Sequence, residues 1–284
     1  MSRMNTLSLY GLKHNPFLPD VPAEALWKPA VVEHFLSRVE ALVETGGFAL
    51  LTGEPGQGKS KVLQLLAQRL EGAGDVTVAV MERPQSRLTD FYRELGERFA
   101  VNLSINNRYG GFKALRARFR THITETLQRP VLLLDECQEA LDDCLNEIKA
   151  LSSHYFDSRS LLTVILCGDT RFPNRLASRD LLPLGTRVRV RLTLAPWDRE
   201  ALADFLDHAL EQAAAPHLMT PELKATLCDH CGGNLRVLSN LAADLLALGA
   251  ERKLPRLDEN LYIEMATPTA RPRPKRPTAA GREA

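Results

Sequence analysis

Apolar positions along the first two thirds of the chain follow two different periods. Short unbroken apolar runs predict buried strands, whereas apolar residues spaced three or four apart predict helices. The predicted strands lie at 48–52, 76–80, 131–134 and 162–167, and a basic strand is expected at 186–192. The predicted helices lie at 32–45, 61–70, 88–99 and 112–127. Because strands alternate with helices, we expect an α/β fold whose parallel sheet is covered by helices on both faces.

Strand patterns end near Pro196, and helical patterns follow at 200–214, 221–231 and 235–248. We therefore expect an α/β domain at 31–195 and a small all-helical lid at 196–265. Prolines at positions 16, 22 and 29 exclude a long helix across residues 1–30, which should form an ordered, irregular arm. Residues 266–284 combine proline and basic residues with almost nothing apolar, which is typical of a disordered tail.

Composition indicates an ordinary globular protein, with 44% hydrophobic and 25% charged residues. No apolar run approaches the roughly 18 residues of a membrane span, and no apolar signal core follows the start, so we expect a cytoplasmic chain without a membrane partner. The net charge is +1, but the segment after Met265 carries +4, which leaves about −3 elsewhere. Nucleic acid would therefore be contacted through local patches or the tail.

The five cysteines are an odd number, and we expect reduced, mostly buried thiols. Cys228 and Cys231 have the C-x-x-C spacing of zinc ligands, but the sequence offers no second pair to complete a closed site. These two thiols are therefore expected to pack between helices.

A glycine-rich segment between a predicted strand and a predicted helix carries the strongest chemical signal. It fits the pattern G-x-x-x-x-G-K-[ST], and its residues are Gly53, Glu54, Pro55, Gly56, Gln57, Gly58, Lys59 and Ser60. In such a phosphate loop, backbone N–H groups and a helix N-terminus meet phosphate oxygens. We expect Lys59 to reach the β- and γ-phosphates, Ser60 to bind Mg²⁺, and Lys61 to adjoin the nucleotide.

Asp135 and Glu136 follow the apolar strand 131–134, where a parallel sheet usually presents its ligand site. Asp135 is expected to hold Mg²⁺, and Glu136 is expected to polarise the water that attacks the γ-phosphate. Together with the phosphate loop, this pair predicts nucleotide hydrolysis.

The order of these motifs resembles that of AAA+ ATPases, which implies an AAA+ P-loop NTPase fold with ATP and Mg²⁺. The further motifs of that order are a strand ending at Asp169, the basic strand from Thr186, and Gly233-Asn234-Leu235-Arg236. Over about residues 8–250, the chain resembles TniB/TnsC transposition ATPases and the similar ExeA secretion ATPases. The narrower motifs are Asn15-Pro16-Phe17, Leu51-Thr52-Gly53 and the Gly-Asn-x-Arg-x-Leu-x-Asn-Leu pattern that ends at Leu241.

This resemblance implies a homo-oligomer, a ring or a filament, with nucleotide between neighbouring protomers. Arg187 would then be the arginine finger for the next protomer, although Arg189 and Arg191 share its predicted strand face. Arg236 matches the position that senses the nucleotide, and Phe17 would either line the adenine or anchor the arm by packing. Asp169 replaces an uncharged polar sensor residue, so hydrolysis would be slow or Thr170 would act instead.

Basic residues in two places are candidates for DNA contact. Lys113, Arg116 and Arg120 share one helix face, and Arg83 and Arg87 lie in the loop where related assemblies present DNA-binding residues. Ordinary solvated charge is the alternative for each of them.

The leading hypothesis is an ATP-dependent regulator of DNA transposition that assembles on duplex DNA and recruits or activates a transposase, with a targeting protein as a further possible partner. Hydrolysis would drive disassembly. The alternatives are an ExeA-like secretion or remodelling ATPase and a nucleotide-gated scaffold with little turnover.

Overall fold

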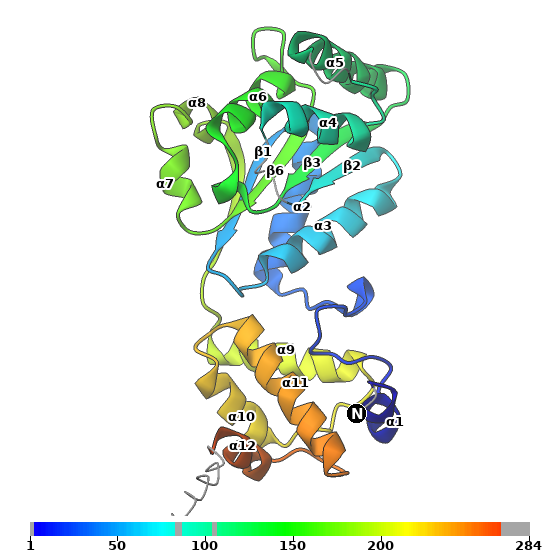
Figure 1. Ribbon diagram of the computed structural model, residues 1–284, viewed down its shortest axis with the longest axis vertical. Helices are drawn as coiled ribbons and strands as arrows, with labels where there is room; N and C mark the ends of the chain where they lie inside the picture. Colours follow the sequence, from blue (N-terminus) through cyan, green and yellow to red (C-terminus); the bar gives the residue numbers. More distant parts are fainter. Residues whose placement is uncertain (1–2, 83–86, 104–106, 268–284) are drawn as a thin grey trace, which may run out of the picture.

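A five-stranded parallel sheet forms the centre of the α/β part, in the order β2-β3-β6-β1-β7 (Figure 1). The computed structural model describes residues 3–82, 87–103 and 107–267. The strands are β1 Gly47–Gly53, β2 Val76–Met81, β3 Arg129–Leu134, β6 Thr163–Gly168 and β7 Val188–Leu194. Every strand expected from the apolar runs is present, so the prediction of a parallel α/β sheet is confirmed.

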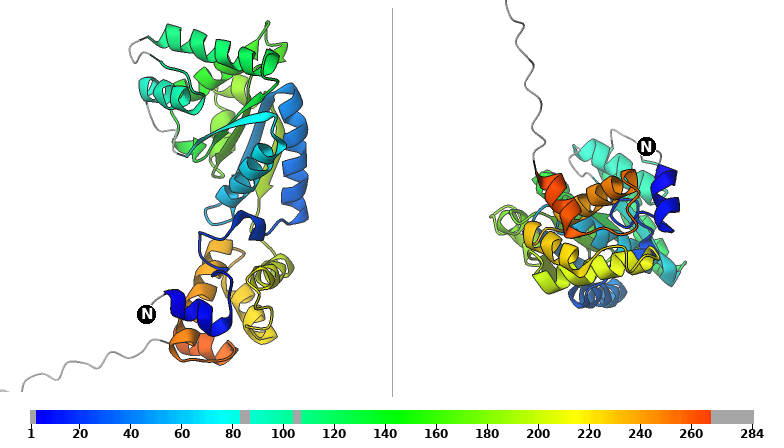
Figure 2. Two further views of the ribbon diagram at one scale, coloured as in Figure 1. Left: turned by 90° about the vertical axis from the view of Figure 1, so that its right-hand side faces the viewer. Right: turned by 90° about the horizontal axis from the view of Figure 1, so that it is seen from below.

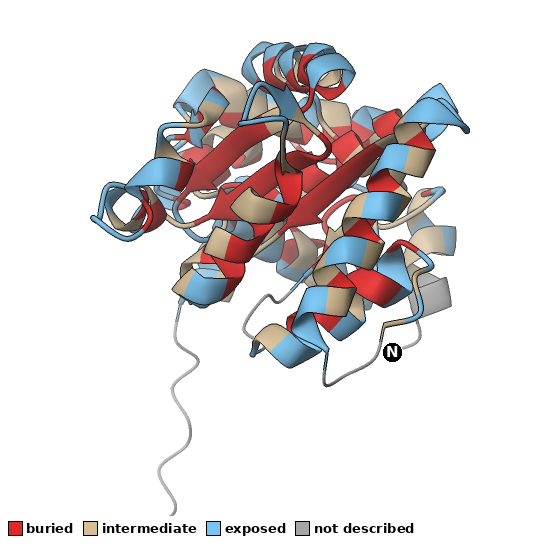
Figure 3. Ribbon diagram, turned by 90° about the horizontal axis from the view of Figure 1, so that it is seen from above, coloured by how far each residue is buried: buried red, intermediate tan, exposed pale blue. Residues whose placement is uncertain are grey.

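Helices cover both faces of this sheet, and the pleat of each strand explains why. In β1, Phe48 and Leu50 pack on one side of the sheet, whereas Ala49 and Leu51 pack on the other. Figure 3 shows the buried strands between helices whose outer faces are exposed. The first side is covered by α4 Leu88–Arg98, α5 Arg108–Thr124, α6 Asp142–Ser152, α7 Phe172–Leu176 and α8 Leu182–Gly185, and the second by α2 Ala30–Thr45 and α3 Lys59–Ala73.

The helical part after β7 forms a separate hydrophobic core together with the N-terminal arm. Leu12 and Phe17 of the arm are buried in that core, and Figure 2 shows the first helix lying beside the lid. The elements are α1 Arg3–Tyr10, the 3-10 turn η1 Ala23–Ala25, α9 Arg199–Gln212, α10 Pro221–His230, α11 Leu235–Glu251 and α12 Glu259–Ala266. None of the helices in the described ranges is long and apolar enough to cross a membrane.

Several elements differ from the sequence-based expectation. The arm contains α1, which is possible because that helix ends before Pro16. The sequence did not predict α1, α6, α7, α8 or α12, nor the 3-10 turn η2 Cys137–Glu139 or the two-stranded hairpin of β4 Ser153–His154 and β5 Arg159–Ser160. Helix α5 ends at Thr124 rather than at Leu127, because Leu127 adopts a left-handed backbone conformation with φ 54°. Glycine usually occupies that conformation at a helix end and marks the end in the sequence. Because leucine stands there instead, the sequence gives no signal that α5 ends.

Candidate nucleotide-binding site

The predicted phosphate loop connects β1 to α3 at the end of the sheet that faces the lid (Figure 1). Gly56 and Gly58 have φ values of +89° and +98°, a conformation that side chains rarely adopt. Gly58 is the N-cap of α3, and no acidic residue occupies the first turn of that helix. The free backbone N–H groups and the helix dipole therefore favour an anion at this position.

Lys59 lies across the loop that precedes it. Its Nζ donates hydrogen bonds to the main-chain oxygens of Gly53 at 2.9 Å and Glu54 at 3.1 Å. The Glu54 side chain accepts a hydrogen bond from the Thr170 hydroxyl at 2.6 Å. These contacts hold an ammonium group over the loop, as phosphate binding requires.

The predicted magnesium ligands meet at the carboxyl edge of the sheet. The hydroxyl of Ser60 donates to Asp135 Oδ2 at 3.0 Å, although the two residues are 75 positions apart. Both follow parallel strands, and such strands present their carboxyl ends at the same edge. A hydroxyl and a carboxylate are the hard oxygen ligands that Mg²⁺ prefers, so these residues fit that ion.

Glu136 has a left-handed backbone with φ 53°, which costs about 1–3 kcal/mol for a residue with a side chain. Its amide donates to Asp135 Oδ1 at 2.9 Å, and its carboxylate accepts a hydrogen bond from the Gln138 side chain. Gln138 Oε1 in turn accepts from the Asp169 amide at 3.0 Å. Gln138 therefore joins the two acidic positions, and no sequence motif pointed to it.

Asp169 is paired with Arg171, whose Nε lies 2.7 Å from Asp169 Oδ2. Burial opposes ionisation of this carboxylate, but hydrogen bonds and charge from Arg171, with Lys59 adding to them, lower its pKa. The repulsion expected between Asp169 and a phosphate is thus offset within the protein. No sequence motif pointed to Arg171.

The lid contacts three consecutive carbonyl groups of the phosphate loop. Asn234 Nδ2 donates to the oxygen of Pro55 at 2.9 Å, and the Arg236 amide donates to the oxygen of Gly56 at 3.1 Å. The indole of Trp197 donates to the oxygen of Gln57 at 3.2 Å. Arg236 is therefore anchored beside the loop through its backbone, with its side chain exposed.

Two predicted nucleotide contacts have their side chains elsewhere. Lys61 Nζ donates to the arm carbonyl of Pro19 at 2.6 Å, because this lysine faces away from the loop on the first turn of α3. Burial lowers its pKa, against the opposing charge of Asp20. Phe17 is only 4% exposed and packs in the lid core, so it matches the packing alternative.

Arg187 lies at the edge of the sheet opposite its own phosphate loop. Val188, the first residue of β7, pairs in parallel with Phe48 near the start of β1. The backbone of Arg187 is therefore separated from the loop by the length of β1, which is roughly 20 Å at 3.3 Å per residue. The expectation that Arg187 shares a strand face with Arg189 and Arg191 is wrong, because Arg187 precedes β7. Its guanidinium binds the Asp157 carboxylate and the carbonyl of Pro183.

The candidate DNA-contacting residues separate into different groups. Arg116 points inward and donates to the carbonyls of Ala150, at 2.8 Å, and Ser153, so a free phosphate-binding role is not supported. Lys113 and Arg120 are exposed on α5, and Arg87 is exposed at the start of α4. Arg83 lies outside the described residues.

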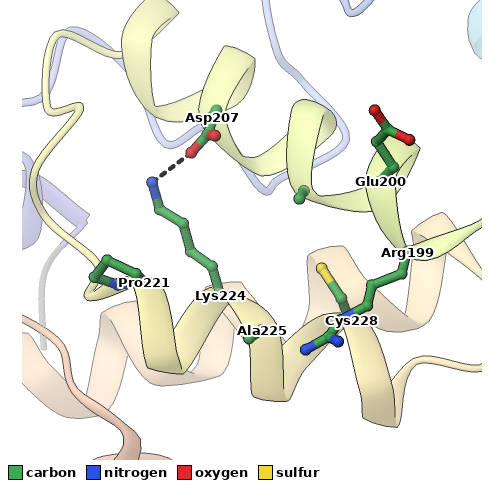
Figure 4. Close-up of a pocket in the computed structure, with 8 residues that line it drawn as sticks. Arg199, Glu200, Asp207, Pro221, Lys224, Ala225 and Cys228 are labelled. Carbon is green, nitrogen blue, oxygen red and sulfur yellow. Dashed lines mark hydrogen bonds and ion pairs between the residues drawn. The ribbon is translucent and has the colours of Figure 1, made fainter.

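Cys228 and Cys231 are buried in the lid core, as expected of packing thiols. Cys228 also borders a groove of about 570 Å³ between α9 and α10, where Lys224 and Asp207 form an ion pair (Figure 4). This groove lies on the lid and includes no residue of the phosphate loop. It is therefore distinct from the nucleotide site.

Comparisons with known proteins agree with this geometry. Residues 42–176 match the family model of the AAA domain. The chain is 29% identical over 213 residues to general secretion pathway protein A of Aeromonas hydrophila, a match that covers 74% of this chain and only 38% of that relative. The ORC2 protein of Aeropyrum pernix in its ADP form has a TM-score of 0.68 at 14% identity, covering 88% of this chain and 70% of that one. Drosophila ORC bound to DNA has a TM-score of 0.67 at 14% identity, covering 93% and 65%.

The chain thus has the fold of AAA+ P-loop NTPases. Membership of the narrower TniB/TnsC type stays a prediction.

Proposed function

We propose that this chain is an ATPase that assembles with further copies of itself on duplex DNA and regulates transposition. The observation that carries its ATPase core is the convergence of Ser60 and Asp135, 3.0 Å apart, beside the lysine-bearing loop. A hydroxyl, a carboxylate and an ammonium group at one helix N-terminus match the requirements of a magnesium-bound triphosphate.

Each residue of this site has a distinct task. Lys59 and the backbone of Gly56 and Gly58 bind the phosphates, and Ser60 and Asp135 would hold Mg²⁺. That ion supplies positive charge that stabilises the charge developing on the phosphate oxygens. The Glu136 carboxylate, oriented by Gln138, accepts a hydrogen bond from the attacking water and aligns it.

The proposed active site is completed by a neighbouring copy. Arg187 lies far from its own phosphate loop, so it can only serve the nucleotide of another protomer. A guanidinium brought to the γ-phosphate stabilises transition-state charge. Arg236 would report through the lid whether nucleotide is present, since its amide already binds the loop.

Duplex DNA is the proposed ligand on which copies of this chain assemble. Arg87 at the N-cap of α4 and Lys113 and Arg120 on α5 are exposed, so they can reach phosphates. Lys113 would leave the ring of Tyr109, whose centroid lies 4.4 Å from its Nζ. A protein with the same fold, Drosophila ORC, is described as bound to DNA. The proposal that a transposase is the partner rests on the motifs from Asn15 to Phe17 and from Gly233 to Leu241.

A secretion-type ATPase is the second candidate, and the identity to general secretion pathway protein A favours it. Mobility-shift assays with duplex DNA distinguish the two candidates. Under the leading proposal, ATP-loaded protein binds DNA without sequence preference, and its affinity falls steeply with salt. Replacing Lys113 and Arg120 together by Ala should reduce that salt slope by about two, whereas binding without ATP dependence would contradict the proposal.

The decisive test of the chemistry is phosphate release by the wild type and by Glu136→Gln. We expect the variant to bind ATP normally while its turnover falls by about 10²–10⁴-fold. Wild-type turnover as low as that of the variant, with and without DNA, would indicate a nucleotide-gated scaffold instead.

A further inference from the structure

The hairpin of β4 and β5 ends in an exposed aromatic tip. Tyr155 is 71% exposed and Phe156 is fully exposed, and their rings meet edge to face with centroids 6.2 Å apart. The hairpin directly precedes β6, so it lies at the amino-terminal edge of the sheet. Two adjacent exposed aromatic rings are typical of interaction surfaces rather than of ordinary solvent-facing loops.

The backbone of this tip is held in an unfavourable conformation. Tyr155, Phe156 and Asp157 have φ values of 50°, 52° and 67°, all in the left-handed region. Bulky residues rarely adopt that region, and successive residues do so still less. The Ser158 amide closes the turn by donating to the oxygen of Tyr155 at 3.1 Å, and its hydroxyl donates to the same oxygen at 2.6 Å. Backbone strain of this kind persists where the surrounding structure imposes it, often at functional sites.

The base of the hairpin is firmly anchored. Arg116 donates to the carbonyls of Ala150 and Ser153, where α6 ends and β4 begins. The Leu161 amide donates to the oxygen of Ser152 at 2.7 Å on the other side of the hairpin. A fixed base with an exposed apolar tip reduces the entropy lost when the tip binds a partner.

The same tip holds the candidate arginine finger. Asp157 accepts an ion-paired hydrogen bond from Arg187, and Arg187 also donates to the carbonyl of Pro183. The ion pair brings Arg187 to the residue that directly follows the two tip aromatics. We call Tyr155, Phe156 and Arg187 the tip surface.

We propose that the tip surface docks on a second copy of this chain, and that Asp157 holds Arg187 within its own copy until that docking occurs. This inference rests on the proposed function, because Arg187 must act on the nucleotide of another copy. A head-to-tail contact brings the amino-terminal edge of one sheet to the phosphate-loop edge of the next. In the isolated copy, the Asp157 carboxylate neutralises Arg187, and the phosphates of the neighbour then compete for it.

The docking is tested by removing both aromatic rings in Tyr155→Ser/Phe156→Ser. Assembly is followed by sedimentation velocity across protein concentration, with Mg²⁺ and a non-hydrolysable ATP analogue. We expect the midpoint concentration of assembly to rise at least about tenfold, because buried aromatic anchors carry much of an interface. Ile263→Ser is the matched control, since Ile263 is also exposed but lies on α12 of the lid. Melting temperatures and monomer affinity for nucleotide should not change in either variant.

The release of Arg187 is tested by Asp157→Asn below the midpoint of assembly. Turnover there should rise about two- to fivefold, the range expected for losing one partly exposed ion pair. The same change in an Arg187→Ala background should have no effect, which separates the latch from a general effect of charge.

The results of these experiments separate a failure of this inference from a failure of the proposed function. If wild-type protein hydrolyses ATP and assembles, but the double serine variant assembles at the concentrations of the Ile263→Ser control, the docking role is overturned and the ATPase proposal stands. If Asp157→Asn lowers turnover or leaves it unchanged, the latch is overturned. If the wild type neither binds ATP nor assembles with it, the proposed function fails first.

Discussion

The two edges of the same parallel sheet carry different kinds of candidate functional residue. At the carboxyl edge, Lys59, Ser60 and Asp135 come directly after strands or at the start of a helix, and they meet within one copy. At the amino edge, Arg187 and Asp157 meet through loops, far from the phosphate loop of their own copy. Under the proposed function, the carboxyl edge binds the nucleotide of its own copy, and the amino edge acts on the nucleotide of a neighbouring copy.

The strongest test of this difference places an intact carboxyl edge and an intact amino edge on different molecules. Arg187→Ala should lower turnover by about 10³-fold while ATP binding persists, because transition-state charge loses its guanidinium. Mixing this variant with Glu136→Gln should restore part of the phosphate release, since intact acidic edges then meet intact Arg187 residues. Arg189→Ala is the matched control on β7 and should retain most activity. An Arg189→Ala variant as inactive as Arg187→Ala would move the finger to that residue or to both.

The next prediction concerns the carboxyl edge alone and tests the contact between the lid and the phosphate loop. Asn234→Ala removes the bond to Pro55 and the N-cap bonds to the amides of Arg236 and Val237. We expect nucleotide affinity to fall about tenfold, because each lost contact is worth about 1 kcal/mol. Titration with a fluorescent ATP analogue measures this, and Asn240→Ala on the same helix should behave as wild type. Equal affinity in the two variants would mean that the lid contact is incidental.

Arg116 and Lys113 lie on the same helix but should respond oppositely. Arg116→Ala should reduce the free energy of unfolding by about 1–3 kcal/mol, because it frees the carbonyls of Ala150 and Ser153. Its effect on DNA affinity should be small. Lys113→Ala should weaken DNA binding and leave stability unchanged, as denaturant titration and mobility shift will report. The reverse pattern would return Arg116 to the DNA-binding surface.

The weakest predicted effect is on the pH dependence of stability, and it arises from a histidine at the amino edge beside β2. Burial lowers the pKa of His122, with the charge of Arg118 adding to that effect. The unfolded chain therefore binds a proton more readily than the folded chain, so stability should fall as pH drops below about 6.5. Urea midpoints measured above and below that pH should differ less in His122→Gln than in the wild type. His217→Gln, at an exposed position on the lid, should keep the wild-type slope.

Local spacing predicted much of the fold because buried strands and amphipathic helices impose their periods on the sequence. The strands and most helices of the α/β part were therefore predictable to within a few residues. The end of α5 was not, because Leu127 takes a left-handed conformation that normally calls for glycine. The short helices α7 and α8 and the hairpin of β4 and β5 were also missed, since two to five residues are too few to show a period.

The candidate site shows the same limit. The glycines, Lys59 and the acidic pair were recognisable because phosphate and magnesium chemistry needs those residue types at a fixed spacing. Gln138 and Arg171 carry no such pattern, although they hold Glu136 and Asp169 in place. Lys61 was included because it adjoins the motif, yet its side chain binds the arm.

The parallel α/β core and the chemistry of its carboxyl edge can be read from local sequence, because strand, loop and helix follow one another there without interruption. The partners of each arginine depend on tertiary contacts instead. A guanidinium takes its role from the acceptor that reaches it, and those acceptors lie far along the chain. Arg116 finds the carbonyl of Ala150 34 residues away, and Arg187 finds Asp157 30 residues away. No local pattern records such distances, so similar arginines in the sequence bind main-chain carbonyls in one place and the Asp157 carboxylate in another.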